Sequence, residues 1–206
     1  MKNHRFTPVN RSKVPNVVLV GGTGAGKSTV SYLLAKLLGF GVIDLDDLIE
    51  RYVGKPIGQI FQEKGEFGFR DLETEVIDDC SNVLNHVVVA GAGALENEKN
   101  LEKLKKLGPL VWLATPIQEI VHRFVMKPDE LRNRPLLKAA VEIEDKEERI
   151  KFLESKLEEM MDRRKGLYEQ ADLSLTFSYG TSEVCAMSIK SMLLKWGSPQ
   201  GEPDRL

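Results

Sequence analysis

The stretch that most constrains this chain is residues 21–29, which read Gly-Gly-Thr-Gly-Ala-Gly-Lys-Ser-Thr. It matches the phosphate-loop pattern G-x-x-x-x-G-K-[ST], with Gly21, Gly26, Lys27 and Ser28 at the defining positions. The glycines permit backbone conformations that are closed to other residues, so successive amides can wrap an anionic phosphate. The chain is therefore expected to contain a phosphate-binding turn between a strand and a helix.

The flanking segments support this interpretation. Residues 17–20 form an apolar β-branched run that predicts a buried parallel strand, and apolar residues across 30–38 recur at helical spacing. Lys27 supplies positive charge for the outer phosphates, and the Ser28 hydroxyl is placed to ligate Mg²⁺. The alternative is a glycine-rich turn that binds nothing. The expected phosphate-binding residues are Gly22, Thr23, Gly24, Ala25, Gly26, Lys27, Ser28 and Thr29.

Composition limits the other possibilities. A chain of 206 residues with 42% hydrophobic residues is expected to form one α/β domain, and its net charge of -2 favours neither nucleic acid nor an anionic membrane as a partner. No apolar run approaches a membrane-spanning length. Cys80 and Cys185 are predicted to be packed thiols in a reducing compartment, and the scattered histidines lack the spacing of a histidine metal site. We expect a cytoplasmic monomer, or a plastid protein if it comes from a plant and a transit segment has been removed.

Apolar runs alternate with helical patterns along the chain, which predicts a parallel sheet covered by helices. The predicted strands are residues 17–20, a short strand starting at 42–43, 87–90, 110–113 and 173–177. The predicted helices include 30–38, short helices within 48–62, one carrying the stripe from 69 to 83, 100–107, a long one beginning at 142, and 183–194. Residues 65–68 predict a turn between helices, and periodicity fails across 124–138, which is a candidate lid.

An acidic cluster follows the second predicted strand. The carboxyl ends of parallel strands are where open α/β sheets bind ligands, so this cluster is in a functional location. Asp44 and Asp46 are two residues apart, so on an extended strand end both carboxylates point the same way. The alternative is an acidic helix N-terminus that interacts with the helix dipole.

Several stretches follow one another along the chain and carry a further resemblance. They are residues 24–29, 44–46, 65–73 (Gly-Glu-Phe-Gly-Phe-Arg-Asp-Leu-Glu), 87–93, 134–137 (Arg-Pro-Leu-Leu), then Arg164, Tyr168 and 171–172. In order and spacing they resemble the shikimate kinase family. The resemblance implies an α/β three-layer phosphate-loop NTPase fold with a five-stranded parallel sheet, helices on both faces, a small substrate-binding subdomain and a lid. It also implies transfer of the γ-phosphoryl group of ATP, with Mg²⁺, to the 3-hydroxyl of shikimate, in aromatic amino-acid biosynthesis.

Carried over residue by residue, the resemblance assigns catalytic roles to Lys27, Asp46 and Arg134. It adds two arginines to the phosphate loop as nucleotide-binding residues, Arg123 and Arg134. The implied substrate-binding residues are Asp46, Arg70, Glu73, Gly91, Ala92, Gly93 and Arg164. The implied metal-binding residues are Ser28 and Asp44, the latter acting through water.

The chemistry of the arginines agrees with an acidic substrate. Arg70 lies beside the apolar stripe of its helix, with Glu73 three residues later as a neighbour on the helix surface. A guanidinium fork matches a carboxylate, and Glu73 can hold that fork in place. The alternative is that Arg70 and Arg164 are exposed arginines in ordinary ion pairs, and that Arg134 is a surface loop residue. Arg164 is harder to assign from sequence because it has basic residues on both sides.

Two departures from the family pattern leave other functions open. Residues 90–93 read Ala-Gly-Ala-Gly where the family has Thr-Gly-Gly-Gly, and Ala92 would be strained if that position needs a positive φ. Gly166 also replaces a family proline. The rival functions are a kinase of another hydroxylated molecule such as gluconate, and a catalytically inactive relative that only binds nucleotide.

The predicted domain organisation is a single kinase domain at residues 16–196. Within it, about 45–75 would form the substrate-binding subdomain and about 124–138 the lid. Residues 1–15 are predicted to be a flexible arm, and 197–206 a polar tail.

Overall fold

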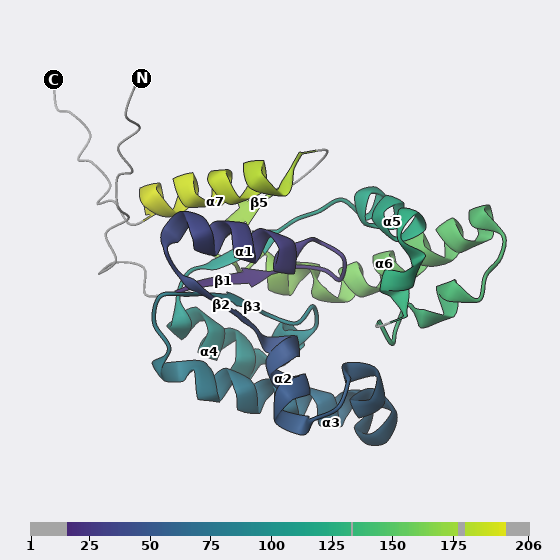
Figure 1. Ribbon diagram of the computed structural model, residues 1–206, viewed down its shortest axis with the longest axis horizontal. Helices are drawn as coiled ribbons and strands as arrows, with labels where there is room; N and C mark the ends of the chain where they lie inside the picture. The colour runs from purple at the N-terminus through teal and green to yellow at the C-terminus, as the bar shows by residue number, and fades with distance from the viewer. Residues whose placement is uncertain (1–15, 133, 177–179, 197–206) are drawn as a thin grey trace, which may run out of the picture.

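The computed structural model describes residues 16–132, 134–176 and 180–196. In this part of the chain five strands form one parallel sheet in the order β2-β3-β1-β4-β5, with helices on both faces (Figure 1). The strands are β1 Val17–Val20, β2 Gly41–Asp44, β3 His86–Val89, β4 Leu110–Leu113 and β5 Leu173–Leu175. The predicted α/β fold with a five-stranded parallel sheet is confirmed.

The central strand β1 is apolar at every position because both of its faces are covered. Val17 and Leu19 belong to the core on one face of the sheet, and Val18 and Val20 belong to the core on the other. All four residues are at most 1% exposed. The continuous apolar run in the sequence is thus the signature of a strand in the middle of a three-layer fold.

The helices divide between the two faces (Figure 1). One face packs against α1 Lys27–Leu38 and α7 Ser182–Trp196, which also contact each other. The other face packs against α2 Leu45–Val53, α3 Ile57–Asp79 and α4 Glu98–Leu107. Short 3₁₀ turns follow α3 and β3, at η1 Cys80–Asn82 and η2 Ala94–Glu96.

A third apolar cluster lies beside the sheet and contains the candidate lid region. It joins α5 Ile117–Met126, the turns η3 Pro128–Leu131 and η4 Lys138–Val141, and α6 Lys146–Tyr168. Phe124, Leu131 and Leu137 are buried in it. The segment where helical periodicity fails therefore has its own small core. Its role as a lid, and the boundaries of the substrate-binding subdomain, stay predictions.

The break between helices predicted at residues 65–68 is present, but it is shorter than a turn of four residues. The helix α3 runs from Ile57 to Asp79 and is interrupted at a single residue, Gly65, whose φ of 68° and ψ of -179° are not helical. Glycine adopts this conformation without the cost that a Cβ would add. The chain therefore kinks at one residue, and the following residues continue as a helix.

The long helix α6 begins later than predicted. The acidic run from 142 was expected to start it, but the helix begins at Lys146 because Asp145 is its N-cap and accepts a hydrogen bond from the Glu148 amide. β5 ends at Leu175, and residue 177, the predicted end of this strand, lies outside the described residues, as do the predicted arm 1–15 and tail 197–206.

Two further expectations concern the cysteines and the membrane. Cys80 and Cys185 are both buried and both free thiols, as predicted. Within the described ranges, no helix combines the length and apolarity that crossing a bilayer requires.

Candidate active site

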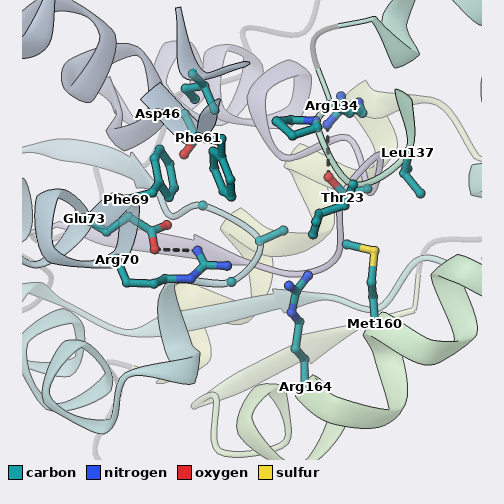
Figure 2. A pocket seen from close by; sticks show the side chains of 16 residues that line it. Thr23, Asp46, Phe61, Phe69, Arg70, Glu73, Arg134, Leu137, Met160 and Arg164 are labelled. Atoms are coloured by element: carbon teal, nitrogen blue, oxygen red, sulfur yellow. Dashed lines mark hydrogen bonds and ion pairs between the residues drawn. The ribbon is translucent and has the colours of Figure 1, made fainter. Parts of the chain in front are cut away.

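Two adjoining pockets open at the carboxyl ends of the strands. We call the first the loop pocket; it is lined by the phosphate-loop residues 23–29 together with Asp44, Arg123 and Arg134. We call the second the clamp pocket; Figure 2 shows most of its side chains, among them Asp46, Arg70, Glu73, Arg134 and Arg164. Thr23, Asp46, Ala92 and Arg134 line both pockets, so a ligand in one would meet a ligand in the other.

The phosphate loop is formed by backbone. Gly24 and Gly26 have φ values of 75° and 93°, and a Cβ on Gly24 would come within 2.7 Å of Ile120 and Phe124 side-chain atoms. Only glycine satisfies both conditions at position 24. Gly26 is the N-cap of α1, so free amides at the helix N-terminus face the loop pocket, which is an anion-binding arrangement.

Lys27 lies folded over this loop. Its Nζ donates hydrogen bonds to the carbonyl oxygens of Gly21, at 2.7 Å, and Gly22, at 3.0 Å. Burial lowers the pKa of Lys27 to about 8, against the attraction of Asp46. The ammonium group is therefore positioned by the loop itself, in the pocket that phosphate would enter.

Ser28 and Asp44 present oxygen atoms beside the loop. The Ser28 hydroxyl donates to Asp44 Oδ2 at 2.8 Å, and both residues line the loop pocket. No group of three or more His, Cys, Asp or Glu residues that could hold a metal occurs in the described part of the chain. Mg²⁺ needs no such cage, because it is typically held by one or two protein oxygens plus substrate phosphates. The Ser28 and Asp44 pair fits that requirement.

The expectation that Asp44 and Asp46 share an extended strand end is wrong. Asp44 ends β2 and is the N-cap of α2, where its Oδ1 accepts from the Asp46 amide at 3.2 Å. Asp46 is already in the first turn of the helix. The alternative of an acidic helix N-terminus is therefore correct for the local structure, yet it leaves Asp46 lining both pockets.

Asp46 is electrostatically unusual. Burial, and then the neighbouring charge of Asp44, raise the pKa of Asp46 to about 6, while Lys27, Arg134 and Arg70 oppose the shift. Its Oδ1 is buried without a hydrogen-bond partner. A buried acceptor without a partner is costly, so this atom is well placed to receive a hydroxyl group.

Arg70 is held on α3 by its own helix. Its Nη1 donates to Glu73 Oε2 at 2.6 Å and its Nη2 donates to Glu66 Oε1 at 2.9 Å. Glu73 was expected on the helix surface, but it is only 1% exposed. Burial raises the pKa of Glu73 to about 7, against the opposing charge and hydrogen bond of Arg70. The signal for this burial was available, since Glu73 falls between Leu72 and Val76 on the apolar stripe.

The turn after β3 carries the substituted glycine motif. An added Cβ on Gly91 would lie 2.4 Å from Glu73 Oε1, and one on Gly93 would lie 2.2 Å from Arg70 Nη2. Glycine is thus present at the two positions where charged side chains approach the backbone. The one non-glycine residue with a positive φ in the described chain is Asn85. Ala92 therefore does not have a positive φ, and its Cβ causes no backbone strain.

Arg164 projects from α6 into the clamp pocket. It is 2% exposed, whereas its neighbours Arg163 and Lys165 face solvent, which resolves the ambiguity among the three basic residues. In Figure 2, Arg164 and Arg70 reach the same pocket from different helices. One turn further along α6, the Tyr168 hydroxyl donates to the Ala92 carbonyl at 2.5 Å, which ties the helix to the turn after β3.

The other two arginines differ in position. Arg134 Nη1 donates to Thr23 Oγ1 at 3.1 Å, and its guanidinium lies 5.2 Å from the centre of the Phe124 ring. Burial lowers the pKa of Arg134, and the residue lines both pockets. Arg123 donates to the Gly24 carbonyl at 3.2 Å and lines the loop pocket only.

Several lining residues were not expected from the sequence. Phe61 and Phe69 form an aromatic wall, with ring centroids 4.5 Å apart, and Leu137 and Met160 add apolar surface (Figure 2). The loop pocket also includes residues 180–182. Apolar side chains of a pocket wall have the same periodicity as core residues, so the sequence offers no signal that separates them.

Comparison with known proteins places this site in a family. The family model described as shikimate kinase matches residues 23–193. The chain belongs to the shikimate kinase family. It is 40% identical over 161 residues to a shikimate kinase from Persephonella marina, covering 78% of this chain and 88% of that relative. It is 37% identical over 172 residues to one from Microcystis aeruginosa, covering 84% of this chain and 82% of that relative.

Solved structures of shikimate kinases have the same fold. A shikimate kinase from Acinetobacter baumannii in complex with shikimate is similar with a TM-score of 0.77 and 36% identity, over 88% of this chain and 94% of that chain. One from Aquifex aeolicus is similar with a TM-score of 0.65 and 29% identity, over 86% of this chain and 95% of that chain. The family predicted from the motifs is therefore confirmed over nearly the whole described chain.

Proposed function

We propose that this chain is a shikimate kinase, which transfers the γ-phosphoryl group of ATP to the 3-hydroxyl of shikimate to give shikimate 3-phosphate. The observation that carries this proposal is that Asp46, Arg70 and Arg164, from three separate helices, line one pocket that adjoins the phosphate loop. That pocket offers two cations for a carboxylate and a buried acid for a hydroxyl. Family membership and the relative solved in complex with shikimate support the same substrate.

On the nucleotide side, the loop amides and Lys27 bind the β- and γ-phosphates of ATP. Ser28 and Asp44 would hold Mg²⁺, which supplies charge neutralisation on the phosphates when it is bound. Arg134 lies between the pockets and neutralises charge on the transferring group. Arg123 lies beside the loop, where it can contact the nucleotide.

On the acceptor side, Arg70 and Arg164 bind the shikimate carboxylate. Glu73 holds Arg70, and the closely packed turn of Gly91, Ala92 and Gly93 bounds the ring. The attacking hydroxyl donates to Asp46, so that the new bond from oxygen to the γ-phosphorus forms as the bond to the leaving ADP oxygen breaks. The hydroxyl proton passes to Asp46 in the same step.

One chain lines both pockets, and we infer that it acts as a monomer. The product would feed chorismate biosynthesis. The named relatives are bacterial enzymes of a metabolic family, and we infer a cytoplasmic location for this step, with a plastid as the alternative in a plant.

A coupled ADP-release assay tests the proposal, with shikimate, with gluconate and with no acceptor. We expect ADP release that depends on shikimate and stays at the no-acceptor background with gluconate. Turnover with gluconate alone would identify a kinase of another hydroxy acid. Nucleotide binding without turnover for any acceptor would identify an inactive relative, an alternative weakened by the absence of a positive φ at Ala92.

A further inference from the structure

Glu96 connects the two arginines of the clamp pocket. Its Oε1 accepts a hydrogen bond from Arg164 Nε at 2.5 Å, and its Oε2 lies 3.8 Å from Arg70 Nη2. Both arginines line the clamp pocket, whereas Glu96 is not one of the lining residues. The carboxylate therefore contacts the guanidinium groups from outside the cavity that they face.

The short turn η2 fixes the position of Glu96. Its amide donates to the Gly93 carbonyl at 3.0 Å, so the residue is tied to the turn that packs against Arg70. Burial acts to raise the pKa of Glu96, but the hydrogen bond and charge of Arg164 and the charge of Arg70 together lower it. The side chain is thus an ionised carboxylate at a defined place.

The two arginines depend on Glu96 to different degrees. Arg70 also pairs with Glu66 and Glu73, so it keeps partners without Glu96. Arg164 has a side chain only 3% exposed, and among the described residues its one ion pair is with Glu96. A buried guanidinium that loses its carboxylate partner reorients or draws in water. Loss of Glu96 should therefore act through Arg164.

The contact at Nε also determines which edge of Arg164 is available. A guanidinium binds carboxylates through the edge formed by Nε and one terminal nitrogen, or through the edge formed by the two terminal nitrogens. Glu96 contacts Nε, so a ligand carboxylate in the pocket would bind through the terminal nitrogens. Figure 2 shows the guanidinium of Arg164 directed into the pocket.

We infer that Glu96 is a positioning residue for the acceptor, which holds Arg164 and Arg70 at the spacing that receives one substrate carboxylate. This inference rests on the proposed function, because it assumes that the acceptor is a carboxylic acid such as shikimate. It assigns Glu96 no contact with the acceptor and no part in phosphoryl transfer.

The test is a comparison of Glu96→Ala, Glu96→Gln and Glu66→Gln in steady-state kinetics. Glu96→Ala should raise KM for shikimate about tenfold, the effect of one lost charge-assisted hydrogen bond, while kcat and KM for ATP stay within about twofold. Glu96→Gln keeps an oxygen acceptor for Nε and should recover most of the affinity. Glu66→Gln is the matched control, because it alters an acid that contacts Arg70 only, and it should change KM less than twofold.

The kinetics should be repeated with a shikimate amide as acceptor, which lacks the carboxylate charge. This comparison keeps the test decisive if Glu96→Ala is poorly stable. The penalty of either Glu96 variant relative to the parent should be much smaller with this acceptor than with shikimate. An unchanged or lower KM for shikimate in Glu96→Ala, or an equal penalty with both acceptors, would overturn the inference while leaving the proposed function intact. A parent enzyme that neither binds nor phosphorylates shikimate would overturn both.

Discussion

The two pockets of this enzyme differ in the groups that line them: mainly backbone amides in one and side chains in the other. The loop pocket takes its anion-binding groups mainly from seven consecutive residues, 23–29, and largely from backbone amides at the start of α1. The clamp pocket takes its groups from side chains on α2, α3, α6 and the turns after β3 and α5. Glycines in the first region shape the backbone, whereas glycines in the second leave room for charged side chains.

This difference affects how each pocket tolerates change. Backbone donors are unaffected by a change of side chain outside the glycines, so among single side chains the loop pocket depends most on Lys27, the cation held on the loop itself. The clamp pocket contains buried polar atoms that have no protein partner, among them Asp46 Oδ1, Arg70 Nε and Glu73 Oε1. Such atoms are costly in an empty pocket and become satisfied by a ligand, so this region is preorganised for a polar acceptor.

The largest expected effect is a loss of kcat that leaves the affinity for the acceptor nearly unchanged. Lys27→Ala should lower kcat about 10²–10³-fold at saturating substrates, because the transferring phosphoryl group loses the preorganised positive charge of the lysine beside it. Shikimate affinity, measured by calorimetry, should stay within about threefold. Lys36→Ala, on the exposed face of the same helix, is the control and should leave both quantities unchanged. A normal kcat for Lys27→Ala would contradict the role of the loop pocket.

Arg70→Ala should instead act on the clamp pocket and weaken acceptor binding. Loss of a charge-assisted contact to the carboxylate is expected to weaken shikimate binding about 10²-fold, with ATP-analogue binding nearly unchanged. Isothermal titration calorimetry with each ligand measures both effects, and the exposed Arg163→Ala provides a matched control. Equal losses for shikimate and nucleotide would show that the two pockets are not separate binding regions.

The pH dependence should also divide between the pockets. Asp46, with a pKa of about 6, becomes protonated and loses its acceptor capacity as pH falls, so kcat/KM for shikimate should drop about tenfold per pH unit below 6. Lys27, with a pKa of about 8, loses its charge as pH rises, so ATP affinity should weaken above pH 8. Lys27→Arg keeps its charge and should lack this alkaline loss. An acidic limb that appears in ATP affinity alone would contradict the assignment to Asp46.

The smallest effect is expected at the substituted glycine motif. Ala92→Gly should leave kcat and KM within about threefold, because the φ of Ala92 lies outside the positive region and its methyl group adds no backbone strain. The same change should lower stability by about 0.5–1 kcal/mol through backbone entropy, which thermal unfolding can measure. A gain in kcat/KM of tenfold or more would show instead that the methyl group obstructs the acceptor.

Sequence patterns predicted the fold and the loop pocket because both are local. The apolar run of β1 and the motif at 21–29 can each be recognised from consecutive residues, without knowledge of the rest of the fold. The clamp pocket was only partly predictable, since Arg70 and Arg164 could be assigned through the family resemblance but their surroundings depend on tertiary packing. The pairing of Glu96 with Arg164 arises from a contact between distant segments. The helical position of Asp46 follows instead from the local cap at Asp44, and the burial of Glu73 from its place on the apolar stripe of α3.

The most direct measurement is the position of phosphate on the product. The enzyme should be incubated with ATP, Mg²⁺ and shikimate, and the product analysed by phosphorus and proton NMR. If the arginine pair holds the carboxylate while Asp46 receives the attacking hydroxyl beside the phosphate loop, phosphorus should couple to the proton on carbon 3 alone. Phosphate on another hydroxyl, or ADP release with shikimate unmodified, would contradict the account.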